Sequence, residues 1–158
     1  IQDSLTGLYN RMAYNQLAIP LYNSCIDENK PLAIMFFDAD HLKMVNDKYG
    51  HDMGNVVIGG IADAIKRSFP HEAVAMRYGG DEFVVLIPDC NEQKAKNMEK
   101  SFHKTLKDMT SAKKLQFDIE ASSGFVIVVD NSRSLDDYIN EADELMYQAK
   151  KRHKAQRD

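Results

Sequence analysis

The chain has 158 residues, of which 44% are hydrophobic and 28% charged, and its formal net charge is −4 at pH 7. This length and composition are typical of one soluble globular domain, and no apolar stretch approaches the ~20 residues that span a bilayer. The negative charge argues against a nucleic-acid-binding protein, which usually has a basic face. Cys25 and Cys90 lack metal-ligand spacing, so we predict reduced thiols of a cytosolic protein.

The first third of the chain predicts a helix, a buried strand and two more helices. Apolar residues at helical spacing indicate a helix within 12–29, which Pro20 should kink or split. The almost wholly apolar run 31–40 predicts a buried central strand that ends in acidic residues. A short helix is then expected to end near Gly50, and a second helix to begin directly after it.

Residues 73–89, AVAMRYGGDEFVVLIPD, predict a β-hairpin. We interpret Gly79 and Gly80 as the positive-φ residues of a tight two-residue turn. Asp81 and Glu82 then stand where the returning strand begins. A turn needs the glycines but not the acids, so the acids require another explanation.

The last third predicts a helix, a strand and a closing helix. Asn91 is a favourable N-cap for a helix with an apolar stripe, and residues 115–129 predict either one long strand or a hairpin bent near Gly124. Ser134 and Asp137 resemble the capping box of the closing helix. The expected core positions of that helix are Tyr138, Ala142, Leu145, Met146 and Ala149. This order predicts an α/β sandwich with helices flanking a mainly antiparallel central sheet.

Acidic residues would cluster if the first strand pairs with the hairpin. Asp38 and Asp40 leave that strand, and Asp81 lies at the hairpin tip. Neighbouring carboxylates repel and raise one another's pKa, so such a cluster is usually held by a cation. Oxygen ligands without His or Cys favour Mg²⁺, which often takes phosphate oxygens as further ligands. The pattern therefore predicts a nucleotide, although acids at strand ends are also common as solvated loop residues.

The basic run 150–154, KKRHK, has two interpretations. It would supply positive charge to the outer phosphates of such a nucleotide. Alternatively, it is a solvated helix end whose cations suit the negative pole of the helix dipole. The chain contains no Gly-rich phosphate loop ending in Lys-Ser/Thr, which excludes a P-loop enzyme.

These motifs allow a resemblance to be named. RYGGDEF at 77–83 resembles the signature of the GGDEF domain, the catalytic domain of bacterial diguanylate cyclases. DSLTGLYNR at 3–11, DADHLKMVNDKYGHDMGN at 38–55 and ADELMYQAK at 142–150 resemble further family motifs, so the likeness extends from residue 3 to about residue 154. The family fold is related to nucleotidyl cyclase and polymerase palm domains, and its members join two GTP molecules into cyclic di-GMP with release of pyrophosphate.

The resemblance also implies partners. Each subunit would hold one GTP, and two domains would face each other in a homodimer so that each 3′-hydroxyl attacks the other α-phosphate. We expect residues 1–158 to be a single GGDEF domain, the C-terminal fragment of a longer protein with an upstream sensory or membrane part. The domain itself would be cytoplasmic and would contact neither membrane nor nucleic acid.

The resemblance assigns the metal site and the catalytic acids by position. Asp38 and Asp81 would bind Mg²⁺ or Mn²⁺ through their carboxylates, and Ala39 through its backbone carbonyl. Asp81 would also assist deprotonation of the attacking hydroxyl. Glu82 would either support the metal site or cap the hairpin.

Nucleotide-binding residues are implied in the same way. The backbone amides of His41, Leu42 and Lys43 would meet the phosphates at a helix N-terminus, and Lys43 is counted with the catalytic residues. Asn46 would bind guanine, and Lys150 would reach the outer phosphates. The implied substrate-binding set is His41, Leu42, Asn46, His51, Asn55, Lys150 and Lys154.

Some of these positions depart from the family pattern. Asn55 replaces the usual aspartate, which removes a charge-assisted hydrogen bond and adds a donor, and Lys154 replaces an arginine and loses its bidentate fork. Pro70 and Ala73 replace the family's inhibitory product site, so we expect no product feedback there. His51 is interpreted mainly as organising the start of its helix.

Three functions remain open from the sequence. The leading hypothesis is an active diguanylate cyclase, because the catalytic and metal-binding acids are present. Loss of the aspartate at position 55 leaves two alternatives, and Lys154 also supports the second of them. One is a hybrid cyclase that also makes cyclic GMP-AMP, and the other is a catalytically degenerate GTP-binding module that acts by binding or dimerisation.

We interpret Asp3, Asn10 and Arg11 as residues that brace the N-terminal turn.

Overall fold

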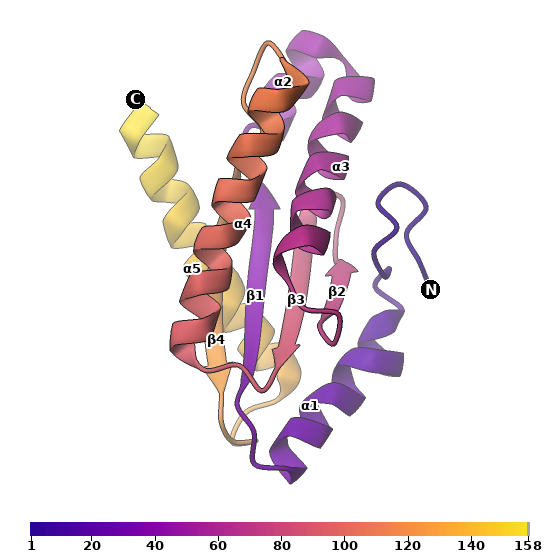
Figure 1. Ribbon diagram of the computed structural model, residues 1–158, viewed down its shortest axis with the longest axis vertical. Helices are drawn as coiled ribbons and strands as arrows, with labels where there is room; N and C mark the ends of the chain where they lie inside the picture. Colours follow the sequence, from indigo (N-terminus) through magenta and orange to yellow (C-terminus); the bar gives the residue numbers. More distant parts are fainter. Residues whose placement is uncertain (158) are drawn as a thin grey trace.

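The structure is a computed structural model that describes residues 1–157 (Figure 1). Its centre is a four-stranded sheet in the order β2-β3-β1-β4, with every pair of neighbouring strands antiparallel. The strands are β1 (Leu32–Ala39), β2 (Val74–Arg77), β3 (Glu82–Pro88) and β4 (Ala121–Val128). This arrangement confirms the predicted antiparallel sheet and the pairing of the first strand with the hairpin.

Helices cover both faces of the sheet. They are η1 (Tyr14–Ala18), α1 (Ile19–Asp27), α2 (Leu42–Tyr49), α3 (His51–Ser68), α4 (Glu92–Lys113) and α5 (Leu135–Arg157). Helices α3 and α4 pack on one face, and α1 and α5 on the other (Figure 1). Among the described residues, no helix combines the length and apolarity that a membrane crossing requires.

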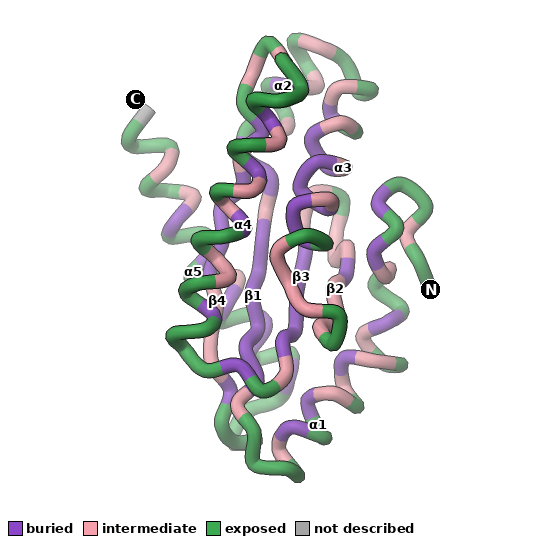
Figure 2. Tube along the Cα trace, viewed as in Figure 1, coloured by how far each residue is buried: buried purple, intermediate pink, exposed green. Residues whose placement is uncertain are grey.

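The central strand β1 explains why its sequence is apolar without alternation. Ala33, Met35 and Phe37 belong to the core under α3 and α4, whereas Ile34 and Phe36 belong to the core under α1 and α5. Both faces of β1 are therefore buried, as Figure 2 shows along the strand. The sequence of a strand that is covered on both faces is therefore one apolar run, without alternating polar residues.

Pro20 divides the N-terminal helix as predicted. A short π-helix, η1, ends at Ala18, and α1 follows with Pro20 in its first turn. The amide of Ile19 donates to the carbonyl of Tyr14 across this junction, whereas Pro20 has no amide hydrogen to donate. Asn91 also acts as predicted, since its side chain accepts a hydrogen bond of 2.9 Å from the amide of Lys94.

The prediction of a two-residue turn at Gly79 and Gly80 is wrong. Neither glycine has a positive φ. Residues 78–81 connect the two strands, and the amides of Tyr78 and Gly79 both donate to the carbonyl of Glu82, at 2.8 and 3.2 Å. A Cβ at Gly79 would overlap the carboxylate of Glu82, which lies against this glycine.

Gly124 lies inside one continuous strand, so the alternative of a bend is excluded. A Cβ at Gly124 would overlap the backbone amide of Met146 on α5, which means that helix and strand approach as closely as their backbones allow. The prediction that Leu145 belongs to the core is wrong, since this residue is 44% exposed. The backbone of α5 itself touches β4 there and leaves no room for a side chain between them.

Ser134 caps α5 as predicted, by accepting a 3.1 Å hydrogen bond from the amide of Asp137.

Candidate active site

The sheet register brings the acidic residues of two motifs together. In the register, Asp38 on β1 lies opposite Glu82 on β3 and Ser122 on β4. Asp81 precedes β3, and its carbonyl accepts a 3.1 Å hydrogen bond from the amide of Ala39. The pairing of β1 with the hairpin therefore places residues 38, 39, 81 and 82 at one end of the sheet.

The Asp38 carboxyl group is buried and incompletely paired. Its side chain is 17% exposed, and its Oδ1 atom has no hydrogen-bond partner among the described residues. The pKa of Asp38 is raised to about 7, because burial and the neighbouring Asp81 carboxylate together outweigh the lowering effect of Lys150. Such a carboxyl group can bind an additional cation, which would favour its ionised form.

Lys150 of α5 places its ammonium group among the oxygens at the end of β1. Its Nζ atom donates a 2.8 Å hydrogen bond to the carbonyl of Ala39, and it lies 3.4 Å from Asp38 Oδ1 and 3.7 Å from Asp40 Oδ1. A cation, the ammonium group of Lys150, therefore already occupies the space between these oxygens.

The residues at this position fit a hard divalent cation. The donor set is the carboxylates of Asp38 and Asp81 and the carbonyl of Ala39, and the buried Oδ1 atom of Asp38 has no other hydrogen-bond partner within the described part of the chain. The same part contains no group of three or more His, Cys, Asp or Glu side chains suited to a metal. A metal ion here would therefore need water or phosphate oxygens as further ligands, as Mg²⁺ commonly does.

Asp40, which the sequence groups with Asp38 and Asp81, also belongs to a network with Ser122 and His153 that sequence reasoning missed. It accepts hydrogen bonds from Ser122 Oγ at 2.7 Å and pairs with His153 Nδ1 at 3.1 Å. The Ser122 hydroxyl is also 2.9 Å from His153 Nδ1. These contacts attach the end of α5 to β1 and β4, one turn beyond Lys150. The available signal was His153 itself, a histidine within the basic run 150–154.

The N-terminus of α2 opens onto a groove. His41 precedes α2 with φ 59°, and its carbonyl accepts the first intrahelical bond, from Val45. The amides of Leu42 and Lys43 precede that bond, so they have no intrahelical acceptor. The groove has a volume of about 570 Å³ and is lined by Asp40, His41, Tyr147, Lys150, Lys151, His153 and Lys154.

The side chains of Lys43 and Leu42 lead away from this N-terminus. Lys43 is 90% exposed at its side chain and pairs with Asp47 at 2.7 Å, one turn along the surface of α2. Leu42 packs against the core beneath α3 and α4. Both residues therefore offer the site their backbone amides.

The junction of α2 and α3 contains a buried side-chain amide oxygen without a hydrogen-bond partner among the described residues. The Oδ1 atom of Asn46 is buried, and no hydrogen-bond partner for it occurs among the residues that the structure describes. A Cβ at Gly54 would overlap this atom, so the glycine keeps the space that the Asn46 side chain occupies. Sequence reasoning assigned Asn46 but missed Gly54. His51, the first residue of α3, and Asn55, one turn later, are both exposed.

Glu82 lies against the hairpin and near the acidic pair. Its carboxylate occupies the space beside Gly79 that a Cβ would fill. Burial raises the pKa of Glu82, and the nearby carboxylates of Asp143 and Asp81 raise it further. This position is compatible with both predicted roles, support of the metal site and capping of the hairpin.

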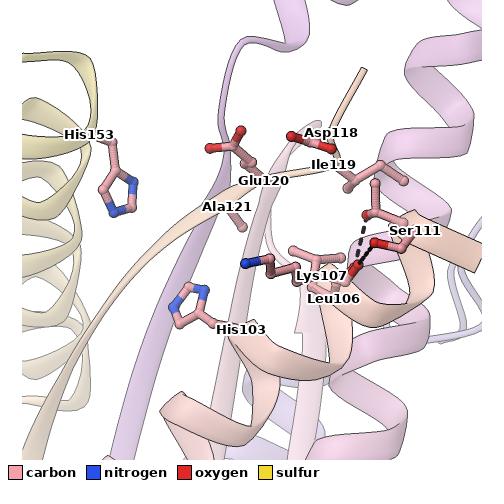
Figure 3. Close-up of a pocket in the computed structure, with 10 residues that line it drawn as sticks. His103, Leu106, Lys107, Ser111, Asp118, Ile119, Glu120, Ala121 and His153 are labelled. Atoms are coloured by element: carbon pink, nitrogen blue, oxygen red, sulfur yellow. Dashed lines mark hydrogen bonds between the residues drawn. The ribbon is translucent and has the colours of Figure 1, made fainter. Parts of the chain in front are cut away.

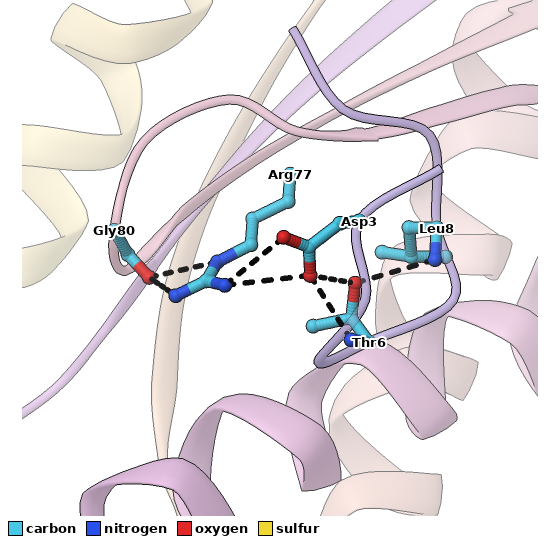
Figure 4. Close-up of polar contacts among 5 residues, drawn as sticks. All are labelled: Asp3, Thr6, Leu8, Arg77 and Gly80. Atoms are coloured by element: carbon cyan, nitrogen blue, oxygen red, sulfur yellow. Dashed lines mark hydrogen bonds and ion pairs between the residues drawn. The ribbon is translucent and has the colours of Figure 1, made fainter. Parts of the chain in front are cut away.

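The N-terminal motif holds the hairpin in place, as Figure 4 shows. The guanidinium group of Arg77 donates to both carboxylate oxygens of Asp3, at 3.2 and 3.3 Å, and to the carbonyl of Gly80, at 3.1 and 2.7 Å. Asp3 also accepts hydrogen bonds from the amide and hydroxyl of Thr6. These contacts confirm that Asp3 braces the N-terminal turn and show that it also fixes one side of the hairpin.

Asn10 and Arg11 complete the brace. Asn10 Oδ1 accepts a 2.9 Å hydrogen bond from the amide of Met12. The guanidinium carbon of Arg11 lies 3.9 Å from the ring centroid of Tyr78, and the same group donates to the Tyr78 carbonyl at 3.4 Å. Asn10 therefore braces the N-terminal turn as predicted, whereas Arg11 contacts the hairpin.

A second pocket lies beside β4, separate from the predicted site residues. It has a volume of about 310 Å³ and extends between His103 of α4 and His153 of α5 (Figure 3). His103 Nε2 is 2.8 Å from Ser123 Oγ, which donates to Glu99 at 2.7 Å. Burial lowers the pKa of His103. His153 lines both this pocket and the groove at α2.

Comparison with known proteins identifies the family. The model of the family described as "Diguanylate cyclase, GGDEF domain" matches residues 1–156. The diguanylate cyclase VdcA of Vibrio cholerae is 35% identical over 153 residues, which cover 94% of this chain and 43% of VdcA. The cyclic di-GMP phosphodiesterase NbdA of Pseudomonas aeruginosa is 30% identical over 148 residues, which cover 94% of this chain and 19% of NbdA.

A solved structure agrees with this result. The GGDEF domain of DgcB from Caulobacter crescentus, crystallised in complex with c-di-GMP, superposes with a TM-score of 0.86 at 26% identity. The match covers 95% of this chain and 90% of the DgcB domain. This chain spans less than half the length of the curated relatives VdcA and NbdA. By the match of the family model over nearly all of its residues, the chain belongs to the GGDEF domain family of diguanylate cyclases.

Proposed function

We propose that this domain is a diguanylate cyclase, which joins two GTP molecules into cyclic di-GMP and releases pyrophosphate. The observation that carries the proposal is the pair of carboxylates Asp38 and Asp81, which lies beside the Ala39 carbonyl and Lys150. Oxygen ligands for a divalent ion thus stand next to a cation and a helix N-terminus suited to phosphates. Phosphoryl transfer needs this combination of charges.

The phosphates of GTP would be bound at the groove by backbone amides and lysines. The amides of Leu42 and Lys43 have no intrahelical acceptor, and the dipole of α2 favours an anion there. Lys150 and Lys154 line the same groove and would neutralise the outer phosphates. The backbone amides are held in place by the helix, so they need little reorganisation as charge develops.

Asp81 would take up the proton of the attacking 3′-hydroxyl. A divalent ion, Mg²⁺ or Mn²⁺, would be held by Asp38, Asp81 and the Ala39 carbonyl, and when bound it supplies charge that stabilises the alkoxide and the phosphate oxygens. Glu82, which faces Asp38 across the strand pair, would support the carboxylate pair.

The base would be bound at the junction of α2 and α3. The buried, unpaired Oδ1 atom of Asn46 can accept a hydrogen bond from the guanine edge. Asn55 is exposed on α3 and offers both a donor and an acceptor, where a carboxylate would only accept. Relaxed base choice, with cyclic GMP-AMP as a second product, is therefore the alternative that this residue favours.

The reaction would require a homodimer. Each chain carries one set of these residues, and cyclic di-GMP contains two equivalent nucleotides. Two domains related by a two-fold axis would present two such half-sites to each other. The relatives are longer than this chain, which supports a role as the output domain of a longer cytoplasmic signalling protein.

Product analysis tests the proposal. The protein is incubated with Mg²⁺ and GTP, ATP or both, and the products are identified by mass spectrometry. Asp81→Ala is expected to abolish product formation, because it removes the proposed base and metal ligand. Asp108→Ala serves as the control, since Asp108 is an exposed acid on α4 that pairs with Lys104.

The possible products distinguish the three functions. Cyclic di-GMP from the unmodified protein and from Asp108→Ala, but not from Asp81→Ala, supports the cyclase. A mixed GMP-AMP product would mean that Asn55 relaxes base choice. GTP binding without any product overturns the catalytic proposal and leaves a nucleotide-sensing module.

A further inference from the structure

Lys150 occupies the position that the proposed metal ion would take. Its Nζ atom is hydrogen bonded to the Ala39 carbonyl at 2.8 Å and lies 3.4 Å from Asp38 Oδ1. These are the oxygens assigned above to the metal. The ammonium group is also 3.7 Å from Asp40 Oδ1, and two-thirds of the Lys150 side chain is buried, since 33% of it is exposed.

An ammonium group and a divalent ion cannot share these oxygens. Two cations bound to the same carbonyl and carboxylate would lie a few ångströms apart in a poorly solvated site, where they repel strongly. Lys150 is also an incomplete partner, since Asp38 Oδ1 still lacks a hydrogen bond within the described part of the chain. A metal ion would therefore have to displace Lys150 before it could bind fully.

The fold lets the side chain of Lys150 move while its helix stays in place. Ala149 is buried, and His153, one turn further, is attached to Asp40 at 3.1 Å. The lysine side chain is flexible and ends in a point charge. It lines the groove at the N-terminus of α2, so phosphates bound there would lie within reach of the same ammonium group.

We propose that Lys150 is an internal cation that holds the metal ligands in the nucleotide-free protein and is released from them when phosphates bind. Metal and nucleotide then bind cooperatively, because the phosphates attract the group that blocks the metal. By linkage, the nucleotide strengthens metal binding by the same factor as the metal strengthens nucleotide binding. This inference rests on the proposed function for the identity of the phosphate ligand.

Mn²⁺ binding without nucleotide tests the inference. Free Mn²⁺ is measured by electron paramagnetic resonance during titration of the wild type, Lys150→Met and Lys104→Met. Lys150→Met is expected to bind Mn²⁺ about tenfold more tightly than the wild type, which is within the usual range of coupling between sites. Lys104→Met removes an exposed lysine of α4 that does not line the groove, and it should bind Mn²⁺ as the wild type does.

Further variants define the site and the direction of the effect. Asp38→Asn should abolish the tight Mn²⁺ binding of the Lys150→Met protein, whereas Lys150→Arg keeps a cation and should show no tightening. Binding of a non-hydrolysable GTP analogue in EDTA should weaken about tenfold in Lys150→Met, since charge-assisted contacts to phosphate are lost. Thermal unfolding of each variant identifies any that does not fold.

The outcomes separate this inference from the proposed function. Equal or weaker Mn²⁺ binding by folded Lys150→Met overturns the inference, even if the wild type makes cyclic di-GMP. Tighter Mn²⁺ binding in a protein that makes no product supports the internal cation and contradicts only the cyclase. Mn²⁺ binding that persists in Asp38→Asn would place the ion elsewhere and would also overturn the inference.

Discussion

Asp38 illustrates how burial controls the charge of a single side chain. Its pKa is raised from the ordinary 3.8 to about 7, because burial disfavours the carboxylate and Asp81 lies close to it. Between these pH values the folded protein keeps a proton that the unfolded chain has released. The contribution of Asp38 to stability therefore falls as the pH rises from about 4 to about 7.

Substitution of Asp38 tests this pH dependence. Between pH 5 and pH 8 in EDTA, the free energy of unfolding of the wild type should fall more than that of Asp38→Asn, by on the order of 2 kcal/mol. Urea denaturation at both pH values measures the difference. If both proteins show the same change with pH, the carboxyl group is ionised at neutral pH and the assigned pKa is wrong.

We predict that substitution of Gly54 weakens nucleotide binding without lowering the stability of the fold. In Gly54→Ala the new methyl group would overlap Asn46 Oδ1 and displace the amide proposed to bind guanine. Alanine in a helix interior is favoured over glycine by about 1 kcal/mol, so stability should be kept. We expect the Kd for GTP to rise about tenfold, the loss of one good hydrogen bond, as measured by isothermal titration calorimetry.

Gly59→Ala is the matched control for this prediction. Gly59 lies in the same helix, and no atom is within 4 Å of a Cβ built there. Its substitution should raise stability slightly and leave GTP binding unchanged. Equal GTP affinity in both variants would show that Asn46 does not contact the base.

The contact between β4 and α5 depends on one glycine. In Gly124→Ala the new methyl group would meet the backbone of Leu145 and Met146, which cannot move without shifting the helix. Overpacking of this kind typically costs 1–3 kcal/mol, and we expect a loss of about 2 kcal/mol in the free energy of unfolding. Because α5 carries Lys150, the shift should also weaken GTP binding.

Gly80→Ala provides the comparison for that contact. Gly80 lies in the connection between β2 and β3, and a Cβ there would meet no atom within 4 Å. Urea denaturation should show little change for Gly80→Ala and a clear loss for Gly124→Ala. Similar stability of the two variants would mean that α5 can move away from β4 at little cost.

For the molecule as a whole, the proposed chemistry requires two copies. The rate of cyclic di-GMP formation per chain should therefore increase with protein concentration, until the dimer is saturated. Fusion to a dimeric coiled coil should remove this dependence, since it raises the effective concentration of the second domain. Analytical ultracentrifugation gives the fraction of dimer, and a constant rate per chain where the protein is monomeric would contradict the proposed homodimer.

Local sequence features predicted most elements correctly because their causes are local. The apolar run before Asp38 is buried on both faces, Pro20 starts a helix, and Asn91 caps one. The paired acids and the glycines of the GGDEF signature also indicated the site before any contact was known. Each of these inferences needs only the residue types and their spacing.

The errors and omissions concern contacts between distant segments. The turn at Gly79 is longer than predicted, because the pairing of β2 with β3 fixes where each strand stops. Leu145 is exposed because α5 rests on Gly124, twenty-one positions earlier in the chain. No local pattern contains the position of the partner, so neither outcome could be read from spacing.

The sequence therefore specified the family motifs, the order of helices and strands, and the residue types of the candidate site. The fold determined which of the charged groups lie next to one another. Asp40, Ser122 and His153 come from three separate segments and form one network around the buried Asp40 carboxylate, and Lys150 reaches the carbonyl of Ala39 across 111 positions of the chain. Such contacts arise only when β1 packs between β3 and β4 with α5 across them, because burial, more than proximity in sequence, brings these groups together.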